Sequence, residues 1–234
     1  MPSTAVAGGP RDTRNGHGAV DEPTKERIIR CATELFARQG YHATGVQEIC
    51  ATAGVGRGAL YHHIKSKELL LYTISVSLLD DMLSRATQIV ASDLSAEAKL
   101  RALARQLLCN LAEHRHGWRV SLYESQALSK PLREQVLAGR DDYERLWSAV
   151  LVDGAAEGVF RPATPLVLRG ILGLLNSTYL WLDPQGPAHP EDVADIYIDL
   201  LLDGLRPNRL PRGDGSSTVP SGPIGTPSGE TKEG

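Results

Sequence analysis

Residues 44–63 constrain the fold of this chain most, because two short helical patterns meet there at a glycine. Thr44 is placed to cap the first helix, with Gln47 three residues later as in a capping box. Gly54 suits the left-handed conformation in which many helices end. The pattern therefore predicts a helix that stops at Gly54. Its apolar face recurs at helical spacing and consists of Val46, Ile49, Cys50 and Ala53.

A second short helix is predicted from about Gly56 to His63. Val55 and Leu60 are placed to pack back on the first helix. Two helices joined by a short glycine-containing turn form a helix-turn-helix, whose second helix enters the DNA major groove. Arg57 is the long donor near the start of that helix and suits bidentate reading of a guanine edge. The residues left to face outward are Arg57, Ala59, Tyr61, His62 and His63.

A set of residues in fixed register surrounds these two helices. In chain order it comprises Gly40-Tyr41-His42-Ala43-Thr44, Ile49, Ala53-Gly54-Val55, Gly58, Leu60-Tyr61, His63 and Lys65-Ser66-Lys67-Glu68. The set resembles the DNA-binding domain of the TetR family of bacterial repressors. Three positions depart from the family pattern: Gly45 replaces a frequent Thr or Ser, Cys50 a common Ala, and Ile64 a common Phe. We expect the change at Gly45 to remove one phosphate contact and the other two to be neutral.

The resemblance implies a repressor that binds double-stranded operator DNA as a homodimer. Tyr61, His63 and Lys67 match family positions that bind phosphates. Thr44 is expected at a helix N-terminus, where hydroxyl and N–H groups suit an anion. For His62 alone, a solvated surface position is an equally good interpretation. The complete set predicted to bind DNA is Thr44, Arg57, Gly58, Ala59, Tyr61, His62, His63, Lys65 and Lys67.

Positive charge is concentrated where DNA binding is expected. The whole chain has 25 Lys or Arg and 28 Asp or Glu, a net charge of −3. Residues 23–72 carry seven Lys or Arg against four Glu, which gives +3 and leaves −6 for the rest. The segment with the helix-turn-helix therefore has the charge that phosphate binding requires.

Every pattern outside this motif is also helical, so the expected fold class is all-α with about nine helices. Residues 1–22 are predicted to be a disordered arm, and the Gly-, Ser- and Pro-rich residues 207–234 a disordered tail. Residues 23–70 are predicted to form the DNA-binding domain and 71–206 a ligand-binding and dimerisation bundle. The helices expected beside the motif span about 23–39, 66–91, 95–116, 118–128, 130–157, 164–182 and 190–204, with Ser66 as the cap of the second of these.

Other functional classes find little support in the sequence. The three cysteines, Cys31, Cys50 and Cys109, lack the spacing of a metal site or a disulfide framework, so a cytoplasmic protein is expected. Neither the paired histidines nor any motif predicts a metal or a catalytic centre. No apolar run has the length of a membrane span. We therefore expect no cofactor, no membrane association and no enzymatic activity.

The C-terminal half is predicted to contain a ligand pocket. Aromatic residues are only 5% of the chain, yet several cluster on the middle and late helices near the polar Asn176. Apolar walls with a few polar groups are typical of a ligand site, although for each single residue ordinary core packing is the stronger alternative. Arg115, Arg119 and Arg140 are candidate basic groups at its mouth. The predicted walls are Leu107, Leu111, Trp118, Tyr123, Tyr143, Trp147, Asn176 and Tyr179.

A second resemblance concerns the ligand. The segments Tyr123-Glu124-Ser125-Gln126-Ala127-Leu128 and Glu157-Gly158-Val159-Phe160-Arg161-Pro162, with Trp181 and Gly186-Pro187, resemble actinobacterial regulators of steroid and fatty-acid catabolism. That subgroup responds to acyl-CoA thioesters, which implies a small hydrophobic or acyl-CoA inducer that releases the repressor from DNA.

Two alternatives to this function remain open from the sequence. One is a ligand-independent activator or architectural factor, and the other is an enzyme that carries a DNA-binding domain.

A homodimer is expected from the last two predicted helices, at 164–182 and 190–205. They carry more apolar residues than one buried face needs, and surplus apolar faces of this kind form four-helix interfaces between two chains. The residues concerned are Leu172, Leu174, Leu175, Leu180, Ile196, Ile198, Leu200, Leu201 and Leu202.

Overall fold

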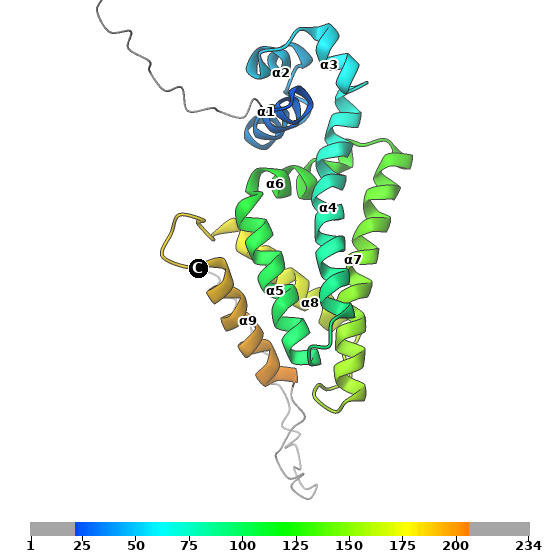
Figure 1. Cartoon of the computed structure of the whole chain (residues 1–234), viewed down its shortest axis with the longest axis vertical. Coiled ribbons are helices and arrows are strands. Elements are labelled where there is room, and N and C mark those ends of the chain that lie inside the picture. Colours follow the sequence, from blue (N-terminus) through cyan, green and yellow to red (C-terminus); the bar gives the residue numbers. More distant parts are fainter. Residues whose placement is uncertain (1–21, 206–234) are drawn as a thin grey trace, which may run out of the picture.

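The computed structural model describes residues 22–205, and these residues form nine α-helices and two 3₁₀ turns with no strand (Figure 1). This confirms the all-α prediction. The arm and tail predicted at 1–22 and 207–234 lie outside the described residues, apart from Glu22. In chain order the elements are α1 (Thr24–Gln39), α2 (Val46–Ala53), α3 (Arg57–His63), α4 (Lys67–Ala91), α5 (Ala96–Glu113), α6 (Arg115–Tyr123), η1 (Ser125–Ala127), α7 (Lys130–Ala156), α8 (Pro165–Ser177), η2 (Thr178–Leu180) and α9 (Pro190–Leu205).

The 25-residue helix α4 runs from the small N-terminal bundle into the larger C-terminal one (Figure 1). Ser66 caps it as predicted, since its hydroxyl accepts a hydrogen bond from the N–H of Leu69 at 3.0 Å. Leu70 and Leu71 are buried in the N-terminal core, whereas Met82 is buried in the C-terminal core. One continuous helix therefore contributes to both cores.

The N-terminal core is completed by residues from the C-terminal bundle. Helices α1, α2 and α3 supply most of its apolar side chains, with Phe36 and Ile49 nearly inaccessible to solvent. Three further members come from α6, the segment after η1 and α7: Val120, Leu128 and Val136. The core thus crosses the domain boundary predicted at residue 70.

The C-terminal core lies between α4, α5, α7, α8 and α9. Trp147 of α7 is fully buried at its centre, and Leu100 and Leu108 of α5 pack in the same cluster. Helix α9 is also held to α5 by charge, because Nε of Arg105 donates to Asp195 at 2.7 Å and Arg101 donates to Asp199 at 2.6 Å. These ion pairs are partly exposed, and the inner face of α9 packs on the core through Ala194, Ile198 and Leu202.

Helix boundaries depart from the predictions at three places. The chain breaks at His114, whose φ of −113° and ψ of 36° are not helical, so α5 ends before residue 116 and α6 begins before Trp118. The helix predicted at 118–128 ends at Tyr123 in α6, and its last predicted turn is the 3₁₀ turn η1. The final predicted turn of α8 is likewise the 3₁₀ turn η2. The other expected helices agree with the observed ones to within about two residues, the ordinary uncertainty of helix ends.

Candidate DNA-binding surface and internal cavity

Helix α3 presents one face to solvent and one to the core. Leu60 is buried in the core formed with α1 and α2. The rest of the helix is exposed, and so is Lys65 just beyond it. The exposed residues of α3 are Arg57, Gly58, Ala59, Tyr61, His62 and His63. The structure thus leaves an uncovered helix face of the kind that a helix reading the major groove requires.

The turn before α3 is fixed by glycine and by an arginine of α1. Gly54 has φ of 63° and ψ of 37°, a left-handed conformation that glycine adopts without strain. Nε of Arg27 donates to the carbonyl oxygen of Ala53 at 2.9 Å, which satisfies one of the last carbonyls of α2. The turn between α2 and α3 is therefore stabilised both by Gly54 itself and by a contact from α1.

Thr44 does not cap α2, contrary to the prediction. Gly45 occupies the N-cap position, and no side chain caps the helix. The Thr44 hydroxyl is buried and donates instead to the carbonyl oxygen of Gly40 at 2.8 Å, while Gln39 donates to it at 3.3 Å. The Thr44 side chain therefore stabilises the loop before α2. It could contact DNA only if this loop opened.

Lys67 is also engaged inside the protein. Its ammonium group donates to the carbonyl oxygens of Tyr41 and Thr44, each at 2.9 Å, and lies 4.2 Å from the centre of the Tyr41 ring. A cation at the first residue of a helix faces the positive end of the helix dipole, and these contacts offset that cost. Lys67 is better described as a clamp on residues 41–44 than as a free phosphate ligand.

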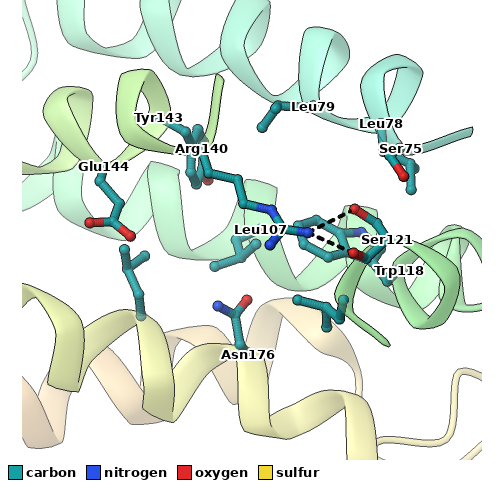
Figure 2. Close-up of a pocket in the computed structure, with 12 residues that line it drawn as sticks. Ser75, Leu78, Leu79, Leu107, Trp118, Ser121, Arg140, Tyr143, Glu144 and Asn176 are labelled. Carbon is teal, nitrogen blue, oxygen red and sulfur yellow. Dashed lines mark hydrogen bonds between the residues drawn. The ribbon is translucent and has the colours of Figure 1, made fainter. Parts of the chain in front are cut away.

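The second candidate site is a cavity of about 240 Å³ inside the C-terminal bundle (Figure 2). Helices α4, α5, α6, α7 and α8 all contribute to it. The walls are mainly apolar, with leucines and the Trp118 ring, and the polar groups are few. The complete lining is Ser75, Leu78, Leu79, Leu107, Trp118, Ser121, Leu122, Arg140, Tyr143, Glu144, Leu172 and Asn176.

Arg140 reaches across the cavity to α6. Its Nη2 donates to the carbonyl oxygen of Ser121 at 2.6 Å and to the hydroxyl of Ser121 at 3.2 Å (Figure 2). Burial lowers the pKa of Arg140 because the low-dielectric surroundings disfavour the charged form. Burial likewise raises the pKa of Tyr143, so this phenol stays protonated.

Half of the predicted pocket residues line this cavity, namely Leu107, Trp118, Tyr143 and Asn176. The other half lie elsewhere. Leu111 and Trp147 are buried in packed surroundings, as the core alternative expects. Tyr123 is 57% exposed, and its ring lies 6.1 Å from that of Tyr179, which lines a separate groove near α1.

The three arginines predicted at the mouth of the pocket also lie in different places. Arg115 donates to the carbonyl oxygen of Leu182 at 2.6 Å and lies over the Tyr179 ring. Arg119 lines that same outer groove. Only Arg140 belongs to the cavity.

Sequence reasoning missed Arg140 as an internal residue, although a signal was present. Val136, Arg140, Tyr143 and Trp147 follow one another at helical spacing along α7, and three of them are buried core residues. A charged residue within a buried stripe indicates an internal polar site. The serines of the cavity gave no such signal, because isolated serines on helices are common.

Among the described residues, hydrogen bonds hold the two bundles together at and next to the boundary at residue 70. The backbone N–H of Tyr41 donates to Glu124 at 3.1 Å, and the N–H of Ser129 donates to Glu68 at 2.7 Å. The hydroxyl of Tyr72 donates to Gln135 at 2.7 Å. Glu124 directly follows α6, so the helix that receives Arg140 from the cavity also contacts the loop before α2.

Residues 22–205 contain neither a metal-binding cluster nor a membrane-spanning helix. No group of three or more His, Cys, Asp or Glu side chains in this range is arranged to hold a metal ion. None of the helices described combines the length and apolar character needed to cross a lipid bilayer.

Replacing Lys67 with methionine tests its role as a clamp. The variant keeps the apolar stem but loses two charge-assisted hydrogen bonds, so we expect the free energy of unfolding to fall by about 1–2 kcal/mol. The exposed Lys65→Met is the matched control and should change it by less than about 0.5 kcal/mol. Urea unfolding at equal protomer concentration measures both. A Lys67→Met protein as stable as the wild type would contradict the clamp.

Comparison with known proteins supports the same two-part organisation. A model of the bacterial regulatory proteins of the tetR family matches residues 28–72, and a model of the tetracyclin repressor-like C-terminal domain matches residues 93–205. The HTH-type transcriptional repressor KstR2 of Mycolicibacterium smegmatis is 32% identical over 186 residues, which cover 77% of this chain and 90% of that protein.

Solved structures of regulators have the same fold. The TetR family regulator PfmR from Thermus thermophilus is 34% identical, with a TM-score of 0.72 over 77% of this chain and all of that one. AibR, solved in complex with isovaleryl coenzyme A and operator DNA, is 26% identical, with a TM-score of 0.66 over 76% of this chain and 97% of that one. These matches favour a transcriptional regulator over an enzyme, and the chain belongs to the TetR family of bacterial regulatory proteins.

Proposed function

We propose that this protein is a homodimeric repressor that binds operator DNA in the cytoplasm through α3 and leaves it when a small ligand fills the cavity. The observation that carries the proposal is α6, which contacts the cavity on one side and the DNA-binding bundle on the other. The similar proteins are a named repressor, KstR2, and AibR bound to isovaleryl coenzyme A and operator DNA. A small hydrophobic or acyl-CoA ligand is therefore the expected inducer class.

DNA recognition is assigned to α3 and the residue just after it. Arg57 lies exposed at the first position of the helix, where its guanidinium can read a guanine edge. The neighbouring Gly58 has no atoms near its missing side chain, so nothing blocks close approach of the backbone. Tyr61, His63 and Lys65 are exposed and suited to phosphates, which position the protein without specifying sequence.

The dimer surface is assigned to α8, η2 and α9. Leu200 and Ile196, one turn apart on α9, are 66% and 64% exposed, although the opposite face of α9 is buried. On α8 and η2, Leu166 and Leu180 are 74% and 69% exposed. Apolar residues this exposed on adjacent helices are typical of an interface. Of the surplus leucines and isoleucines predicted for it, Leu172, Leu175, Ile198 and Leu202 instead fill the core.

Release from DNA is assigned to movement of α6. A ligand that changes the contacts of Arg140 with Ser121 acts on α6, and Val120 and Glu124 carry any displacement into the DNA-binding bundle. Residues 23–70 act as the DNA-binding unit and 71–206 as the sensing and dimerisation unit, joined by this shared core. A tilt of α4 accompanies the movement because α4 belongs to both cores.

The Arg57→Ala variant tests DNA reading. We expect it to lose about 1–3 kcal/mol of discrimination between operator and scrambled DNA, because the base contact is gone. The control Lys65→Ala should weaken binding to both sequences alike and reduce the salt slope by about one. Fluorescence anisotropy with an operator selected from genomic DNA by the wild-type protein, at several salt concentrations, measures both. Unchanged discrimination by Arg57→Ala would remove Arg57 from base reading.

The Leu200→Glu variant tests the dimer surface. A charge in the centre of an apolar interface is strongly unfavourable, so we expect the variant to sediment as a monomer at micromolar concentration, where the wild type sediments as a dimer. Leu137→Glu places the same charge on an exposed position of α7 and should remain dimeric. A monomeric wild type would refute the assembly, and a dimeric Leu200→Glu would move the interface elsewhere.

The Glu124→Ala variant tests coupling between the bundles. It removes the acceptor of the Tyr41 N–H, which we expect to lower operator affinity by about fivefold, or about 1 kcal/mol, and to speed amide hydrogen exchange at residues 41–45. Glu124→Gln keeps an acceptor oxygen and should behave more like the wild type. If neither the affinity nor the exchange rate differed between the Ala and Gln variants, this hydrogen bond would not couple the bundles.

A further inference from the structure

The cavity contains a positive charge that has no negative partner close to it. The partly buried guanidinium of Arg140 makes its hydrogen bonds with Ser121, which is neutral, and no ion pair of Arg140 is present within the described residues. Glu144 also lines the cavity, but Figure 2 shows the Arg140 side chain extending away from it, toward Ser121 and Trp118. Burial of a charge is costly unless it is paired with an opposite charge.

Other polar groups of the cavity are also unsatisfied. Tyr143 is only 7% exposed, and the polar side chain beside its hydroxyl is the Trp147 indole, which lies outside the cavity and makes no hydrogen bond of ordinary geometry with it. The side-chain oxygen of Asn176 is buried without a partner as well. Buried polar atoms normally have partners, and each exception calls for a specific cause. A ligand oxygen would supply an acceptor for the Tyr143 hydroxyl, whereas the Asn176 oxygen is itself an acceptor and needs a donor.

The geometry of the cavity limits the rest of the ligand. A cavity of about 150 Å³ accommodates benzene, so by proportion 240 Å³ holds a ligand of roughly ten non-hydrogen atoms. Leu79, Leu107 and Leu172 supply an apolar surface for its body. Pockets that bind drug-sized ligands usually measure about 300–1,000 Å³. The smaller volume of this cavity therefore favours a compact ligand.

From these observations we propose that the cavity binds a compact carboxylate of about ten non-hydrogen atoms, with its anionic group at Arg140 and its apolar body between α4, α5 and α8. The planar guanidinium matches the two oxygens of a carboxylate, and it retains N–H groups beyond the one directed at Ser121. The Tyr143 hydroxyl supplies an additional donor. This inference rests on the proposed function and specifies the ligand of the same sensing site.

Two pairs of probes test the charge preference in the dimer at neutral pH. Octanoate and octanamide have the same size but differ in charge, and so do cyclohexanecarboxylate and cyclohexanecarboxamide. Calorimetry with the wild-type protein should show at least one acid bound tenfold or more tightly than its amide. Equal affinity within both pairs, or no binding of either acid, would overturn the proposal.

Variants of α7 test whether the preference for the acid over the amide depends on Arg140. Arg140→Met should abolish the preference for the acid, whereas Arg140→Lys should retain part of it. Arg145→Met, at an exposed position on the same helix, should leave it unchanged. Circular dichroism and thermal unfolding without ligand establish that each variant is folded. An Arg140→Met protein that is folded and still prefers the acid tenfold would overturn the assignment.

Two further measurements separate this inference from the proposed function. Octanoyl-CoA that binds and releases operator DNA, while octanoate and cyclohexanecarboxylate do not bind, would overturn the carboxylate and support ligand-released repression. Conversely, an acid that binds through Arg140 but leaves operator affinity unchanged would support the carboxylate site and contradict its role in release.

Discussion

The burial of Val120 in the core of the DNA-binding bundle is the contact on which this structure depends. Val120 belongs to α6, yet its side chain is fully enclosed in a core made largely by α1, α2 and α3 together with the start of α4. Three short helices enclose too little apolar surface for independent stability, so the bundle takes Val120, Leu128 and Val136 from the C-terminal half. Because packed cores deform little, displacement of α6 cannot be absorbed locally and must alter the position of α1 or the loop that follows it.

Much of this fold follows from periodicity. The apolar stripes of α1, α4 and α7 and the glycine turn at Gly54 each identify a helix or its end from neighbouring residues alone, and the structure confirms these elements. The break at His114 was misplaced because residues on both sides have helical character, and only the packing of α6 across α1 sets where the chain turns.

Site residues were harder to predict when their role depends on distant partners. Lys67 contacts carbonyl oxygens that lie 26 and 23 residues earlier in the chain. No local sequence pattern predicts a contact over that distance. Thr44 has the chemistry of a cap, but a competing acceptor, the carbonyl of Gly40, takes its hydroxyl. For the cavity, the aromatic residues identified α6 and α7 but not α4, which also lines it, and the direction of each ring decided which residues line the cavity. Tyr143 lines it and Trp147, one turn later, does not.

The energies available at α6 are of the size that regulation requires. A ligand shifts an equilibrium between two states only by its difference in affinity for them, typically about 1–3 kcal/mol. A hydrogen bond that involves a charged group contributes about 1.5–3 kcal/mol, and α6 carries one at each end of the path, from Arg140 to Ser121 and from Tyr41 to Glu124. Exchange of a single such contact in the cavity is therefore sufficient to bias the DNA-binding bundle. If the proposed release mechanism holds, reciprocity requires operator DNA to weaken ligand binding by the same factor, so that binding at α3 and binding in the cavity are coupled through α6.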